Sequence, residues 1–130
     1  YRMLKHWGFD KLAKKEYAES IGEMKHADWL MDRIFMLDGL PNLQDLAKLQ
    51  VGEDVPEILA CDLSSERGAQ ATIKDGIAHC EVARDYVSRD LLQIILDDTE
   101  EHIDFLETQI ELIAKVGLPN YLQSQMGEVE

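Results

Sequence analysis

The sequence predicts an all-α fold, a bundle of long antiparallel helices, and three observations support this prediction. Apolar residues recur every three or four positions almost throughout the 130 residues, which is the helical period. No segment shows the alternation of polar and apolar residues that is typical of a strand. Glycine and proline turn signals separate three long segments. A chain of this length with 45% hydrophobic residues can bury one core, so we expect a single domain over residues 1–130.

The first two elements are a helix end and a long helix. Apolar and aromatic side chains share one face of residues 1–8, and Gly8 ends the run. We interpret this segment as the end of a first helix whose larger part the chain does not contain. The second helix is predicted over residues 10–37, with Asp10 as its N-cap. The turn signal Asp-Gly-Leu-Pro-Asn at 38–42 closes it.

A long connection over residues 38–54 follows the second helix. Helices of a simple up-and-down bundle are joined by ~2–8 residues, so we expect this connection to cross the bundle from end to end. Such a crossover is typical of the ferritin-like four-helix topology.

The rest of the chain predicts two more long helices and a short one. Asp54 is predicted to cap a third helix over residues 55–84. A fourth helix is predicted over residues 86–116 and has Gly117 as its C-cap. A short fifth helix is predicted over residues 118–127.

Composition argues against two classes of partner. The net charge is −13, from 26 acidic and 13 basic residues, which argues against nucleic acid. The acids indicate either solvated helix faces or a surface that gathers cations. No apolar run approaches the ~20 residues of a membrane span, and no signal-peptide pattern is present, so we expect a cytoplasmic protein. Cys61 and Cys80 lie about 28 Å apart along one predicted helix, so we expect free thiols in a reducing compartment.

Four residues predict a metal centre. Glu23 and His26 are three residues apart, so they share one face of the second helix. They interrupt an apolar face there, as Glu66 does on the third helix and His102 on the fourth. A buried carboxylate is costly unless it is paired or bound to a cation. One core histidine is more often hydrogen-bonded than metal-bound, but ligand types on three helices together favour a di-iron carboxylate centre, with manganese as the other candidate.

The predicted centre is incomplete in two places. A second Glu-x-x-His step needs a glutamate three residues before His102, where the chain has Thr99. Asp98 is an alternative ligand, although it is shorter and displaced by about 40° around the helix. The remaining carboxylate is expected from the first helix, which this chain largely lacks.

Met24 occupies a different face from the predicted ligands. It follows Glu23 by one position and therefore projects about 100° away from it, toward a flank that it shares with Tyr17, Met31 and Phe35. Methionine in a helix–helix interface is the ordinary interpretation. An apolar stripe on an outer face needs a partner surface, so we expect dimerisation there.

These motifs resemble the bacterioferritins. The resemblance rests on EYAESIGEMKHADWLMDRIFMLDGLPNLQDL, VGEDVPEILACDL, RDYVSRDLL, EEHIDFLETQIELI and GLPNYLQSQMGE, and it covers essentially the whole chain. It implies a cage of twenty-four four-helix subunits built from two-fold dimers, with haem b between paired subunits. Such cages oxidise Fe(II), the ferroxidase reaction, and store iron as a ferric mineral core.

The resemblance also implies roles for individual residues. It assigns iron binding to four positions: Glu23, His26, Glu66 and His102. It makes Met24 the haem axial ligand, one from each subunit of the dimer, with further haem-pocket candidates at Tyr17, Ile21, Lys25 and Trp7.

Departures from the family pattern shape the functional prediction. Thr99 replaces a ferroxidase glutamate, and Ala18 and Gly22 stand where relatives often carry histidine and aspartate. We therefore expect a haem-binding iron-storage subunit with an incomplete ferroxidase centre, co-assembled with a second, competent bacterioferritin subunit type. The alternatives are an active di-iron ferroxidase that uses Asp98 or water as the replacement ligand, and a redox haem protein without iron storage.

Overall fold

The computed structural model describes residues 1–42 and 49–127, and within them it confirms the all-α prediction. The helices are α1 (Arg2–His6), α2 (Asp10–Met36), α3 (Val55–Val82), α4 (Tyr86–Val116) and α5 (Leu118–Ser124). The predicted crossover includes residues 43–48, which lie outside the described residues. Among the described helices, none combines the length and the apolar character that a membrane crossing requires.

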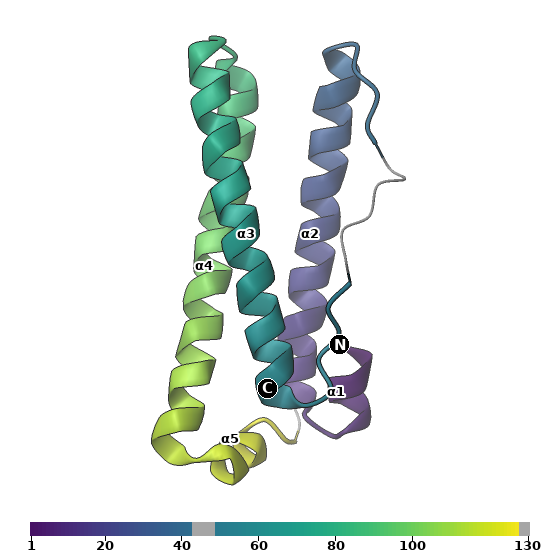
Figure 1. Cartoon of the computed structure of the whole chain (residues 1–130). Helices are drawn as coiled ribbons and strands as arrows, with labels where there is room; N and C mark the ends of the chain where they lie inside the picture. The colour runs from purple at the N-terminus through teal and green to yellow at the C-terminus, as the bar shows by residue number, and fades with distance from the viewer. Residues whose placement is uncertain (43–48, 128–130) are drawn as a thin grey trace.

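The three long helices run side by side (Figure 1). Helices α2 and α3 point in the same direction and α4 points in the opposite one. Because the end of α2 and the start of α3 lie at opposite ends of the bundle, this order agrees with the predicted ferritin-like topology. Helix α3 packs along the length of α4, whereas α2 approaches α4 in far fewer places.

The helix starts agree with one predicted cap and correct another. The Asp54 side chain accepts a hydrogen bond from the backbone N–H of Glu57 at 2.8 Å, which confirms it as the N-cap of α3. The prediction for Asp10 was wrong, because α2 begins at Asp10 itself. Its N-cap residue is Phe9, which has no side-chain acceptor to offer.

Helices α2, α3 and α5 end earlier than predicted. Helix α2 ends before Asp38 and α3 ends before Arg84, and these two residues have φ angles of 61° and 59°. A left-handed residue breaks the helical hydrogen-bond pattern, so neither helix continues through it. Gly117, with φ of 84°, ends α4 as predicted. Helix α5 ends at Ser124 and not at residue 127 as predicted, and Gly127 has a φ of 89°, which is incompatible with a helix.

The apolar core lies at the end of the bundle where α1, α5 and the first turns of α2 and α3 meet. Its buried members include Leu4, Leu12, Leu59, Leu106 and Tyr121. Helix α2 contributes only its first turns to this core, because Leu12 and Ala13 are its buried residues. The middle of α2 faces a cavity through both polar side chains, such as Glu19 and Glu23, and apolar ones, such as Leu30.

A polar cluster joins the other end of α2 to the start of α4. The Arg33 guanidinium donates to Ser88 Oγ at 2.8 Å and to Asp85 Oδ1 at 2.9 Å. Asp85 is also the N-cap of α4, where it accepts a hydrogen bond from the backbone N–H of Ser88 at 3.1 Å. We call these three residues the Arg33 cluster.

Candidate metal centre

The three long helices line an open cavity of about 420 Å³ in the middle of the bundle. Ionisable side chains from all three helices line it: Lys15, Glu19, Glu23 and His26 from α2, Glu66 from α3, and Asp98, Glu101 and His102 from α4. Acidic groups outnumber basic ones there, so the cavity favours a cation over an anion.

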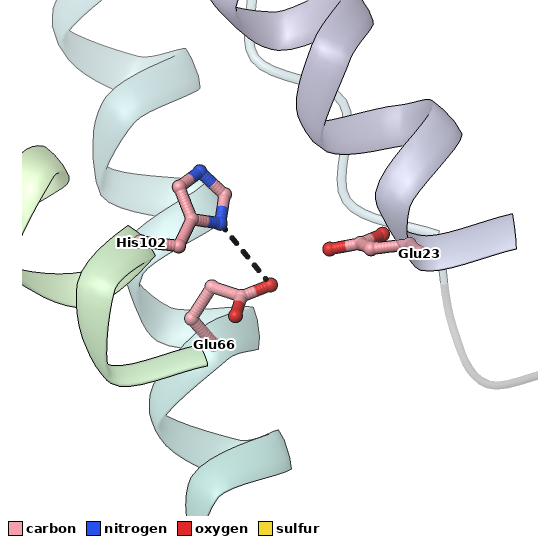
Figure 2. Close-up of side chains that lie close together, drawn as sticks. All are labelled: Glu23, Glu66 and His102. Atoms are coloured by element: carbon pink, nitrogen blue, oxygen red, sulfur yellow. Dashed lines mark ion pairs between the residues drawn. The ribbon is translucent and has the colours of Figure 1, made fainter. Parts of the chain in front are cut away.

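Three of the predicted ligands converge on this cavity. Donor atoms of Glu23, Glu66 and His102 all lie within 4.8 Å of one another. Figure 2 shows Glu66 and His102 adjacent to each other and Glu23 approaching them from α2. Nδ1 of His102 lies 3.5 Å from Oε1 of Glu66. Glu66 and His102 are almost fully buried, whereas Glu23 is exposed.

Proton sharing compensates the charge of this group. Although Glu23 as a residue is exposed, desolvation of its carboxyl group raises its pKa to about 7, and the hydrogen bond to Glu66 and the charge of Glu66 act in the same direction. Burial alone would raise the pKa of Glu66, but its bonds with His102 and Glu23 outweigh burial and lower it. Burial likewise opposes the positive charge of His102, yet pairing with Glu66 and the nearby Glu19 and Glu16 carboxylates raises its pKa. The protons held by Glu23 and His102 therefore lie where a metal ion could take their place.

His26 lies beside this group but has another partner. Its Nε2 atom lies 2.7 Å from Oδ2 of Asp98, so the pair joins α2 to α4. The group of three does not include His26 or Asp98. Asp98, which was predicted as a substitute metal ligand, is thus bonded to His26, which was itself predicted as a ligand. A carboxylate in this position orients a histidine ring and fixes its tautomer.

Thr99 does not replace the missing glutamate. Its side chain is buried, and Oγ1 donates a hydrogen bond to the backbone carbonyl of Ile95 at 2.8 Å. Threonine has no carboxylate, and its side chain is two atoms shorter than that of glutamate. Its hydroxyl proton is also used within α4, so Thr99 does not offer a strong ligand to the cavity.

Sequence reasoning missed two acids next to the centre. Glu16 and Asp62 line a smaller pocket of about 140 Å³, together with Glu19 and the group of three. Within residues 1–42 and 49–127, Glu16 Oε1 and Asp62 Oδ2 are buried without a hydrogen-bond partner. Burial and the adjacent Asp62 raise the pKa of Glu16 to about 8. The spacing of Glu16, Glu19 and Glu23 at three and four residues was the signal that could have identified it.

The predicted haem residues lie on the outer side of α2. The Met24 side chain is 62% exposed, and Tyr17 and Phe35 are 50% and 55% exposed. Trp7 and Lys25 are also exposed, and Ile21 and Met31 are half-buried. The Tyr17 ring packs against Tyr1, with 5.0 Å between ring centroids. These residues form a largely apolar, partly exposed surface, and none of them lines the candidate metal-binding cavity.

Comparisons with known proteins agree with this geometry. Residues 1–116 match the model of the ferritin-like domain family. The bacterioferritin of Brucella melitensis is 49% identical over 123 residues, which cover 95% of this chain and 76% of the relative. The bacterial ferritin of Pseudomonas aeruginosa is 47% identical over 126 residues, 96% of this chain and 81% of the relative. The bacterioferritin of Mycobacterium bovis is 45% identical over 116 residues, 89% and 73% of the two chains. The chain therefore belongs to the ferritin-like family and, within it, to the bacterioferritins.

Proposed function

We propose that this chain is an iron-storage subunit whose own di-iron centre is incomplete. Two observations together support the proposal best. Three potential ligands converge in the cavity, and the residue in the position of a further carboxylate is Thr99, whose hydroxyl is bonded to its own helix. Fe(II) enters as cargo, and Glu23, Glu66 and His102 bind it at the cavity. A second Fe(II) lacks the carboxylate that residue 99 would supply, so paired oxidation is slow on this chain.

The proposed haem site is the exposed surface around Met24. Its thioether suits a haem axial position because the side chain is 62% exposed, on a helix that also carries the exposed aromatic residues Tyr17 and Phe35. In a two-fold dimer the same surface faces its copy, so one methionine per chain supplies both axial ligands. Tyr17, Ile21, Lys25 and Trp7 then line or support the pocket. When bound, haem b supplies an electron carrier suited to reducing stored ferric iron for release.

The proposed assembly is an oligomeric cage in the cytoplasm, made from two-fold dimers and holding a ferric mineral core. A subunit with a weak centre is useful in such a cage if a second subunit type provides fast oxidation. The exposed apolar surface around Met24 supports dimerisation, because burying it removes a large apolar area from water. The mixed cage explains why a chain can keep its haem surface while losing a carboxylate.

An active ferroxidase is the second candidate function. It needs Asp98 or water to replace the missing carboxylate. The bond between Asp98 and His26 argues against the aspartate, because the same oxygen is bonded to an imidazole 2.7 Å away. A redox haem protein without iron storage would not need the acidic cavity.

Native mass spectrometry of the assembly purified from its own cells tests the proposal. It reports the subunit types and the haem count in one measurement. We expect two subunit types in one cage and haem bound between paired subunits. A single chain type without haem would contradict both the mixed cage and the Met24 assignment. Haem without an iron core after Fe(II) loading would favour the redox protein.

A further inference from the structure

The ammonium group of Lys15 is held in the lining of the cavity, between α2 and α4. Its Nζ atom lies 2.9 Å from Oε1 of Glu19, one turn further along α2, and 4.9 Å from the centroid of the Phe105 ring on α4. The face of an aromatic ring attracts a cation, so both contacts hold the ammonium group in the same place. Lys14, the preceding residue, is exposed and does not line this cavity. Lys15 therefore brings a positive charge into the cavity lining, whereas Lys14 does not.

Glu19 connects this ammonium group to the candidate metal group. While its Oε1 atom pairs with Lys15, its Oε2 atom lies 3.7 Å from Nδ1 of His102. The Glu19 side chain is only 25% exposed, and it lines the cavity together with Glu23 and Glu66. The group of three does not include it. Glu19 is thus a further carboxylate beside the potential ligands, and Lys15 balances its charge.

The pair of Lys15 and Glu19 differs from an ordinary ion pair on a helix surface. Pairs of residues four apart are usually weak contacts when water surrounds them. Lys115 and Glu111 form such a pair, because their side chains are 68% and 69% exposed and the charged atoms lie 3.7 Å apart. The contact of Lys15 with Glu19 is shorter, its side chains are less exposed, and it lies beside potential metal ligands. Its position indicates an effect on the cation that enters the cavity.

We infer that Lys15 is a tethered competitor for cations: its ammonium group pairs with Glu19, withholds this carboxylate from an entering Fe(II) ion and lowers the affinity of the cavity for that ion. The inference rests on the proposed function in one respect, the entry of Fe(II) as cargo. It goes further by naming a second residue, besides Thr99, that limits iron binding on this chain. Because Lys15 acts through Glu19, it is a positioning residue and not a ligand.

The charges in the cavity explain the expected effect. A divalent cation that leaves water needs compensating negative charge, which Glu23 and Glu66 supply within the group. Glu19 would add to this charge, but the ammonium group beside it offsets its field and repels the incoming ion. Thr99 lacks the negative charge that a glutamate would bring, so Lys15 and Thr99 act in the same direction. Partial exposure of Lys15 to water weakens the effect without removing it.

Titration of the metal-free full chain with Co²⁺ tests the effect on affinity. Lys15→Met removes the charge at similar side-chain length, and we expect it to bind Co²⁺ roughly 3–30-fold more tightly than the unmodified chain. Lys15→Arg keeps the charge, the pairing and the ring contact, so it should retain the affinity of the unmodified chain.

Lys14→Met is the matched control, because it removes the same charge outside the cavity. We expect this control to leave the Co²⁺ affinity nearly unchanged. An affinity of Lys15→Met that is equal to or below that of the unmodified chain would overturn the inference. An equal gain in Lys14→Met would also overturn it, because the effect would then follow from net charge alone.

A double-mutant cycle tests whether Lys15 acts through Glu19. When Glu19→Gln is also present, the ammonium group has no carboxylate to withhold, so Lys15→Met should change the Co²⁺ affinity by less than about twofold. The gain in the single variant should shrink as the ionic strength rises, because salt screens partly exposed charges. A gain of the same size with and without Glu19, or one that does not respond to salt, would refute this role of Lys15.

These readouts separate the inference from the proposed function. If Lys15→Met gains no affinity while the unmodified chain still oxidises Fe(II) more slowly than Thr99→Glu, the inference fails and the proposed incomplete centre stands. If Lys15→Met gains affinity but the unmodified chain oxidises Fe(II) as fast as Thr99→Glu, the incomplete centre fails and the competition by Lys15 stands.

Discussion

Nε2 of His26 lies 2.7 Å from Oδ2 of Asp98, and this contact joins α2 to α4 in the lining of the candidate metal-binding cavity. It gives Asp98 a role that differs from direct ligation. In the incomplete centre that we propose, the aspartate would orient the imidazole of a second metal position, at which Thr99 supplies no carboxylate.

Asp98→Ala should therefore affect only a second ion. We expect the affinity of the chain for its first Co²⁺ to stay the same, because Asp98 lies outside the ligand group. When Thr99→Glu is also present, Asp98→Ala should lower the affinity for the second ion by roughly 10–100-fold, since His26 loses its orienting partner. Isothermal titration with Asp97→Ala as the control measures both effects. Loss of the first ion in Asp98→Ala would show that Asp98 is a direct ligand.

Met24→Leu should remove haem and preserve the fold. Leucine matches methionine in volume but has no sulfur, and the side chain is 62% exposed, so we expect little change in stability. Haem absorbance of the purified protein should fall to background after reconstitution. Met31→Leu is the matched control on the same helix and should keep its haem. Normal haem binding by Met24→Leu would refute the axial assignment.

Glu16 should make the fold less stable at high pH. Its pKa is raised from 4.5 to about 8 in the folded protein, mainly by burial, so the folded state keeps a proton that the unfolded state has lost. Stability from this group therefore falls as pH rises from about 4.5 to 8.

Glu16→Gln removes this dependence. We expect the variant to be more stable than the parent at pH 9 by roughly 1–3 kcal/mol, after allowance for its partial exposure, and nearly equal to it at pH 4. Urea unfolding at both pH values measures the difference. Glu111→Gln, which changes an exposed ion pair with Lys115, is the control. An equal effect at both pH values would mean that Glu16 is not protonated in the folded state.

The Arg33 cluster should make the junction of α2 and α4 sensitive to acid. The side-chain and backbone bonds from Ser88, followed by the Arg33 guanidinium, lower the pKa of Asp85 from 3.8 to about 2. Its contribution to stability is present above pH 3.8 and is lost as pH falls toward 2.

Asp85→Ala should lower Tm at pH 7 by roughly 3–6 °C, because it removes both the N-cap of α4 and the partner of Arg33. At pH 2 the variant and the parent should differ little. Circular dichroism melting curves provide the measurement, with Asp90→Ala as the exposed control. A Tm difference that does not depend on pH would refute the charged cluster.

The sequence was sufficient for the long helices and for the three residues of the candidate metal group, because both depend on local spacing. The step from Glu23 to His26 and the caps at Asp54 and Gly117 are readable within a few residues. The bond between His26 and Asp98 joins positions 72 residues apart, so no local pattern indicates it. The same holds for Arg33 with Asp85, whose meeting depends on how α2 lies against α4.

Burial along α2 was also beyond local reasoning. By helical spacing Ile34 and Leu37 share the apolar face of α2, but they are 36% and 56% exposed. Helical periodicity tells which residues share a face and does not tell whether another helix covers that face. The missing carboxylate at position 99 could, by contrast, be predicted from the sequence, because it follows directly from the presence of threonine there.

The rate of Fe(II) oxidation by the homo-oligomer tests the central claim most directly. Oxygen consumption after Fe(II) addition should be at least about tenfold slower for the unmodified chain than for Thr99→Glu, which restores the second Glu-x-x-His step. A rate that equals that of Thr99→Glu and is abolished by Glu23→Ala would contradict the account, because this chain would then contain a complete and active centre.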